Sequence, residues 1–151
     1  MHLRSIFTIL LFAAFLVVVS TPAFAGSMEK EILVLINKYR AKKKLPPLIE
    51  KNIIENAAEQ HSSNMAKRRV SFGHGGFDSR LDKLLKAIPG ANGGAENVAY
   101  GARSAEQVVD MWIKSSGHRK NILGNYNYTG IGIAKGSDGT PYYTQIFIKA
   151  K

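Results

Sequence analysis

The chain contains no cysteine among its 151 residues. Disulfide bonds, thiol nucleophiles and cysteine-based zinc sites are therefore excluded, and the fold must be stabilised by its hydrophobic core. The sequence also lacks a Gly-x-Ser-x-Gly elbow and a glycine-rich phosphate loop followed by Lys and Ser or Thr. The sequence therefore does not predict a serine hydrolase of the type that uses this elbow, or a nucleotide-binding enzyme of the type that uses this loop.

Acidic residues are scarce. The sequence has 11 Asp and Glu against 21 Lys and Arg, which gives a formal net charge of +10 at pH 7. The densest basic stretches are residues 42–44, 67–69 and 119–120. Three interpretations stay open: a solvated basic surface without a dedicated partner, a surface for anionic envelope polymers or lipids, and, least favoured, a nucleic-acid site.

One long apolar run is present, over residues 6–19. Arg4 precedes it and the small-x-small sequence Ala23-Phe24-Ala25 follows it, which is typical of a secretory signal peptide. The run is short for a membrane span, so an uncleaved anchor is the less favoured alternative. We expect residues 1–25 to be a cleaved signal peptide and residues 26–151 to form one domain. The protein is then expected to be secreted, into the periplasm or the extracellular space.

Hydrophobic periodicity divides the remaining chain into helices and strands. Apolar residues recur at helical spacing over residues 29–43, 51–68, 78–88 and 104–115, and the last of these begins with a capping box from Ser104 to Gln107. A short strand is expected over residues 97–100. Residues 129–134 and 142–149 alternate with a period of two around a Gly-Ser-Asp-Gly turn, which predicts a β-hairpin. Helices followed by strands indicate an α+β layered domain.

Three polar residues beside or near glycines are the main candidates for a functional site: His74, Glu96 and His118. Two imidazoles and a carboxylate are a suitable ligand set for Zn²⁺ or another divalent cation, with a fourth position open to water. The three lie far apart in sequence, so the alternative is three independent hydrogen-bonded residues. We expect them to meet in one cleft.

Other chemically versatile side chains lie at positions that favour burial. His61 follows Ala57 and Ala58 on the apolar face of its helix, so a core histidine is favoured over a ligand. Several aromatic residues are candidates for a sugar or base platform, but their spacing favours the core. These aromatic residues are Trp112, Tyr142, Tyr143 and Phe147.

Several short motifs occur in a characteristic order. They read HSSNMA at 61–66, GH at 73–74, GAENVA at 94–99, WIKSSGHRKNIL at 112–123, TGIGIA at 129–134 and YYTQIF at 142–147. As a set they resemble the CAP superfamily, which includes cysteine-rich secretory proteins, insect venom antigens and plant pathogenesis-related proteins. The chain is most similar to the bacterial SCP-like extracellular branch, and the resemblance runs from about Ile32 to Ile148.

The resemblance implies a three-layer α-β-α sandwich with a central antiparallel sheet. It also implies a cleft of two histidines and two acids that binds zinc or other divalent ions in some relatives. His74 and His118 match the histidines and Glu96 matches one acid, whereas the second acid falls near Ser115 and is absent. Asn97, beside Glu96, and Trp112 match motif positions to which we assign structural roles.

Two functions from different classes follow from this interpretation. The favoured one is a non-catalytic module that binds a ligand or interacts with an envelope or host, and a small apolar or lipid ligand is among its candidates. The alternative is a metal-dependent, peptidase-like hydrolase that uses His74, His118 and Glu96. The missing acid argues against the hydrolase, because Glu96 cannot serve both as third ligand and as general base. The oligomeric state stays open.

Overall fold

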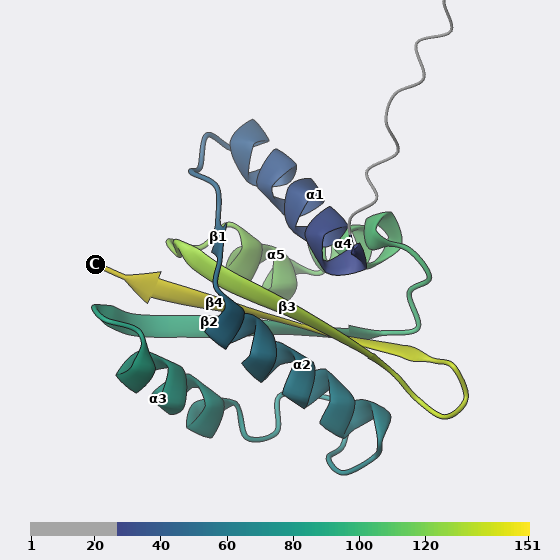
Figure 1. The fold of residues 1–151 in the computed structure, drawn as a ribbon. Helices are drawn as coiled ribbons and strands as arrows, with labels where there is room; N and C mark the ends of the chain where they lie inside the picture. The colour runs from purple at the N-terminus through teal and green to yellow at the C-terminus, as the bar shows by residue number, and fades with distance from the viewer. Residues whose placement is uncertain (1–26) are drawn as a thin grey trace, which may run out of the picture.

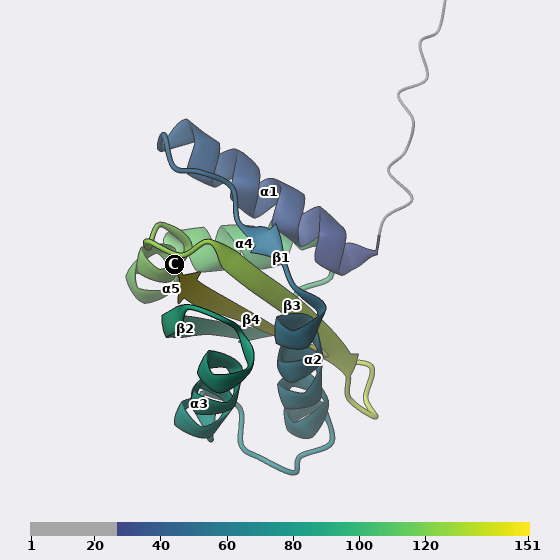
Figure 2. The same cartoon turned by 60° about the vertical axis from the view of Figure 1, so that its left-hand side comes forward.

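The computed structural model describes residues 27–151, so the predicted signal peptide lies outside the described residues. A four-stranded sheet lies between two layers of helices (Figures 1 and 2). The strands are β1 (Ile49–Glu50), β2 (Ala91–Tyr100), β3 (Tyr128–Lys135) and β4 (Pro141–Ala150), in the order β1-β3-β4-β2. The predicted α+β sandwich is confirmed. The sheet is mixed rather than wholly antiparallel, because the short β1 pairs in parallel with β3.

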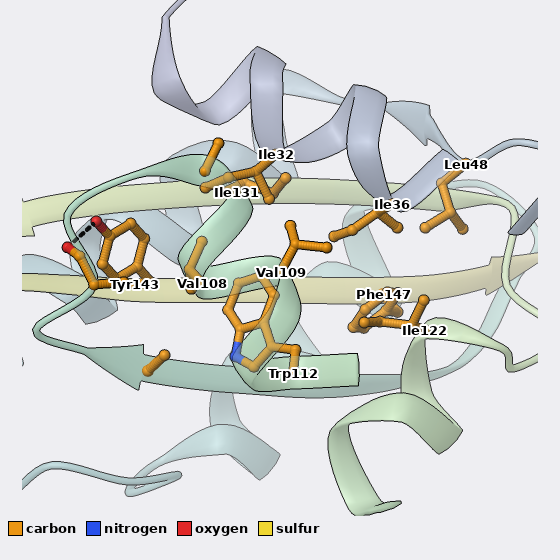
Figure 3. Packing of buried hydrophobic residues seen from close by; sticks show 13 residues of the cluster. Ile32, Ile36, Leu48, Val108, Val109, Trp112, Ile122, Ile131, Tyr143 and Phe147 are labelled. Carbon is orange, nitrogen blue, oxygen red and sulfur yellow. Dashed lines mark hydrogen bonds between the residues drawn. The ribbon is translucent and has the colours of Figure 1, made fainter. Parts of the chain in front are cut away.

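The first helical layer contains α1 (Met28–Lys42), α4 (Ala105–Lys114) and α5 (Ser116–Ile122). A cluster of buried hydrophobic side chains fills the space between these helices and one face of the sheet, as Figure 3 shows. Trp112, Tyr143 and Phe147 are fully buried there, so these three aromatic residues belong to the core. The Trp112 indole donates to the Val98 carbonyl oxygen, which satisfies its polar atom inside the core.

Arg40 is a buried cation in this layer, at the end of α1. Its guanidinium donates to four backbone carbonyl oxygens, at 2.9 Å to Pro46, 2.7 Å to Ile122, 3.0 Å to Gly124 and 3.2 Å to Tyr126. Burial lowers the pKa of Arg40 from its usual value. The carbonyl oxygens satisfy the buried charge and tie α1 to the segment that follows α5.

The second layer contains α2 (Asn52–Ala66) and α3 (Phe77–Ala87), which cover the other face of the sheet (Figure 2). Two glycines in β3 allow α2 to approach closely. A Cβ atom on Gly130 would lie 2.1 Å from the backbone nitrogen of Glu55, and one on Gly132 would lie 2.0 Å from that of Glu59. The alternation of glycine and isoleucine in β3 thus sets the distance between α2 and the sheet.

Most predicted elements are present, with three differences. The Ser104 hydroxyl accepts from the Gln107 amide as expected, and the hairpin of β3 and β4 turns at Gly139 with φ of 79°. However, Gly117 and His118, which follow the predicted fourth helix, lie inside a further short helix, α5, that the periodicity does not predict. The third helix begins at Phe77 after Gly76, and β2 extends from Ala91 rather than from residue 97. No helix among residues 27–151 is long and apolar enough to cross a membrane.

Candidate functional site

Glu96 is at the centre of a polar cluster between β2 and the layer of α2 and α3. Its partner across the sheet is Ile146, a core residue of that layer, so the carboxylate points toward the helices. Arg80 on α3 donates from Nη2 at 2.7 Å to Oε2 and 3.0 Å to Oε1, and from Nε at 3.1 Å to Oε2. His74 Nδ1 donates to Oε1 at 3.0 Å. We call Glu96, Arg80 and His74 the Glu96 cluster.

Exposure differs sharply within the Glu96 cluster. The side chain of Glu96 is 1% exposed and that of Arg80 is 17% exposed, whereas that of His74 is 52% exposed. The carboxylate was expected to line a cleft open to water, but Arg80 and His74 cover it. A buried carboxylate needs such partners, because an unpaired charge away from water is costly. His74 is therefore the member of the cluster that solvent reaches most readily.

His61 lies beneath the cluster and is also buried. Its Nε2 donates to the Gly73 carbonyl oxygen at 2.8 Å and lies 3.9 Å from Glu96 Oε1. The pKa of His61 is lowered, chiefly because burial disfavours the charged imidazolium and in part because of the charge of Arg80. The hydrogen bond to Gly73 anchors the loop that presents His74, the next residue in the chain.

His118 comes to the same region from α5. The side-chain amide of Asn97, on β2, donates to the His118 carbonyl oxygen at 3.2 Å, and Asn121 donates to the Glu96 carbonyl oxygen at 3.2 Å and to Asn97 Oδ1 at 2.9 Å. These bonds attach α5 to β2. Burial lowers the pKa of His118, and the nearby charge of His74 lowers it further. Ser115 is the partly exposed residue between α4 and α5, and its side chain makes no capping hydrogen bond.

The predicted metal ligands do not form a metal-binding arrangement. Among residues 27–151, no group of three or more His, Asp or Glu side chains is placed to hold an ion. Arg80 engages both oxygens of Glu96, and a guanidinium at that position competes with any cation. The residues present therefore do not fit Zn²⁺ in this arrangement, and metal binding by His74, His118 and Glu96 stays a prediction.

A hollow of about 740 Å³ lies away from these residues, beside the β3–β4 hairpin and the start of α1. Met28, Ile133 and Tyr143 give it an apolar side, while Glu29, Arg103 and Lys135 add charge. Neither the histidines nor Glu96 line it. It has room for a small ligand, and the predicted apolar or lipid ligand stays a prediction.

Sequence reasoning did not identify Arg80 or Asn121, or the exposed aromatic residues near His74. Phe72 and Tyr100 meet edge to face with ring centroids 4.8 Å apart, and Tyr100 stacks on Tyr142 at 5.9 Å. Tyr142 was assigned to the core with Tyr143, but it is only partly buried. The signal was available, because alternation places Tyr142 and Tyr143 on opposite faces of the sheet.

Comparison with known protein families gives a match over most of the described chain. The model of the cysteine-rich secretory protein family, CAP, matches residues 33–147. The uncharacterized protein YkwD of Bacillus subtilis is 34% identical over 131 residues, which are 85% of this chain and 50% of that protein. The uncharacterized membrane protein YlbC of the same organism is 34% identical over 124 residues, 80% of this chain and 34% of that protein. The chain thus spans half or less of these curated relatives.

Solved structures show the same fold. An outer surface protein from Borrelia burgdorferi superposes with a TM-score of 0.72 at 21% identity, over 82% of this chain and 93% of that one. An extracellular protein containing a SCP domain, from Bacillus anthracis, gives a TM-score of 0.67 at 27% identity, over 81% of this chain and 40% of that one.

Proposed function

Because the chain belongs to the cysteine-rich secretory protein (CAP) family, we propose that it is an exported module that binds a ligand at the cell envelope and catalyses no reaction. The pattern of residues 1–25 supports export, since it has the charge, apolar run and small-residue site of a signal peptide. The relatives described as outer-surface and extracellular proteins support the same location.

One observation carries the non-catalytic part of the proposal: Arg80 pairs with both oxygens of Glu96. A hydrolase of the alternative type needs this carboxylate either as a metal ligand or as a base that reaches a water molecule. A carboxylate that is 1% exposed and paired with a guanidinium does neither readily. His74 and His118 alone would hold an ion by two bonds, fewer than the three protein ligands usual in a catalytic zinc site.

Zinc titration calorimetry and peptide hydrolysis test this proposal. We expect the purified protein to bind no stoichiometric zinc and to leave a mixture of unstructured peptides uncut at pH 7, with no change in the variant His118→Ala. One equivalent of tightly bound zinc that is lost in His118→Ala, together with peptide cleavage, would support the hydrolase and overturn the proposal.

The variant Arg80→Gln is the matched control, because it removes the guanidinium and leaves all three candidate ligands in place. Zinc uptake that appears only in Arg80→Gln would show that Arg80 excludes the ion from the natural protein. Circular dichroism of each variant at the assay temperature verifies that it is folded.

A further inference from the structure

A row of aromatic side chains lies at one end of the sheet, on the face that α2 and α3 partly cover. Phe72 comes from the loop between these helices, Tyr100 from the end of β2 and Tyr142 from the start of β4, where Tyr100 and Tyr142 are paired across the strands. Phe72 is 47% exposed and Tyr100 is 53% exposed. We call Phe72, Tyr100 and Tyr142 the aromatic row. Aromatic rings that gather at a surface and keep their hydroxyl groups in water are typical of recognition sites.

A run of cations adjoins the aromatic row. Residues 67–69 are all exposed, and none of them takes part in the ion pairs found within residues 27–151. A Cβ atom built on Gly136 would lie 3.5 Å both from the Ala66 carbonyl oxygen, where this run begins, and from the Tyr142 ring. Hydrogen bonds from Thr140 lower the pKa of Asp138 in the same hairpin, and the charge of Arg68 adds a smaller effect, so Arg68 lies on the side of this hairpin.

Arg68 occupies a backbone position that usually belongs to glycine. Its φ is 54°, and the amides of Arg68 and Arg69 donate to the carbonyl oxygens of Met65 and Asn64, which closes the end of α2 in a Schellman motif. A side chain is disfavoured at this left-handed position, so the arginine is held at a local cost. The motif turns the chain at Arg68 away from the axis of α2, toward the end of the sheet that carries Tyr142.

We propose that the aromatic row and residues 67–69 together bind an anionic polysaccharide. The apolar faces of sugar rings pack against Phe72, Tyr100 and Tyr142, and the tyrosine hydroxyls and His74 offer hydrogen bonds to sugar hydroxyls. Carboxylate or phosphate groups along the polymer pair with Arg68 and Arg69. This inference rests on the proposed function, because an exported binding module meets envelope polymers.

The observations favour a polysaccharide over an anionic bilayer. Side chains that insert into a bilayer project beyond the protein surface, whereas about half of Phe72 and of Tyr100 is covered and the rings pack on one another at 4.8 and 5.9 Å. A nucleic acid would use the same cations and rings, and it enters the test as a competing outcome.

Binding of fluorescent polygalacturonate to the full purified protein tests the inference. Neutral dextran of equal length tests the need for charge, and polyglycerol phosphate tests the need for sugar rings. Single-stranded DNA and phosphatidylglycerol vesicles test the two competing partners. Tyr100→Ala is expected to weaken polygalacturonate binding at least about fivefold, as expected of an aromatic residue central to an interface. Arg68→Gly is expected to weaken it about threefold at low salt, and Gly suits the φ of 54°. Dextran is expected to bind more weakly than polygalacturonate.

Lys44→Gly is the matched control, because Lys44 is also an exposed cation at a left-handed position, with φ of 59°, but lies after α1. Equal losses in Arg68→Gly and Lys44→Gly, or full binding by Tyr100→Ala, would overturn the proposal in favour of unspecific charge attraction. Tighter binding of DNA or vesicles with the same dependence on Tyr100 would overturn it in favour of that partner. Polyglycerol phosphate carries charge but no sugar rings, so its binding more tightly than polygalacturonate would overturn the proposal in favour of a phosphate polymer held by charge alone. Tighter binding of polygalacturonate supports the proposal.

The two proposals fail separately. Polymer that is bound and shortened during incubation would overturn the non-catalytic function and leave the binding surface intact. Absence of binding to every polysaccharide, with no zinc uptake and no hydrolysis, would overturn the binding surface alone.

Discussion

The neighbours of Glu96, above all Arg80, decide what its carboxylate can do. Beside open water it would be a free base or ligand, but Arg80, His74 and the buried His61 surround it on the side of α2 and α3. The sequence indicated Glu96 and His74, because both stand in short motifs rich in glycine. It did not indicate Arg80, since one arginine on the polar side of an amphipathic helix looks like any solvated charge.

Removal of Arg80 should leave Glu96 as an unpaired buried charge. We expect Arg80→Met to lower the free energy of unfolding by about 3 kcal/mol, measured by urea denaturation at pH 7, because breaking a buried pair on one side is costly. The double variant Arg80→Met with Glu96→Gln should recover part of this loss, since the uncompensated charge is gone. Equal stability of Arg80→Met and the natural protein would show that the ion pair is not desolvated as the structure describes.

At the scale of elements, the close contact of α2 with β3 and the docking of α5 on β2 are held by different means. The first depends on glycine, because Gly130 and Gly132 leave no side chain between the strand and the helix backbone. The second depends on the amides of Asn97 and Asn121. The hairpin and the four longer helices could be predicted from periodicity. The short α5 could not, because its sequence SGHRKNI has poor intrinsic helix propensity and is held by tertiary hydrogen bonds.

One glycine substitution tests the close contact of α2 with β3, and another tests whether α5 is helical. Gly132→Ala should destabilise the protein by about 3 kcal/mol, the upper end expected of overpacking, because its Cβ would lie 2.0 Å from backbone atoms of α2. Gly117→Ala should raise the free energy of unfolding by roughly 0.5–1 kcal/mol, since Gly117 lies within α5 and no atom lies within 4 Å of its added Cβ. Thermal melts of both variants measure these effects, and a loss of stability in Gly117→Ala would argue against a helix at that position.

At the scale of the whole molecule, stability should depend on pH through two histidines, His61 on α2 and His118 on α5. Burial lowers the pKa of His61 and of His118, so the folded protein binds fewer protons at these sites than the unfolded chain, whose histidines titrate near about 6.5. The two neutral imidazoles therefore contribute fully to the free energy of unfolding above pH about 6.5, and this contribution is lost as the pH falls below that value. We expect the melting temperature to fall between pH 7.5 and 5.

His61→Gln isolates this effect, because a glutamine amide can still donate to the Gly73 carbonyl oxygen but does not titrate. The variant should show a smaller fall in melting temperature over the same range, and a second variant, His118→Gln, should reduce it further. A melting temperature that stays constant or rises as the pH drops from 7.5 to 5 would contradict the buried, neutral state of both imidazoles.

The order in which the chain is made gives the Arg40 contacts a further consequence. Three of its four acceptor carbonyls belong to residues 82 to 86 positions later in the sequence, and β1 likewise waits for β3. A chain leaving the ribosome cannot complete the layer around α1 until nearly all of it has been synthesised. Such dominance of distant contacts slows folding. Under the proposed export, slow completion of this layer leaves the newly made polypeptide unfolded long enough to pass through a translocation channel.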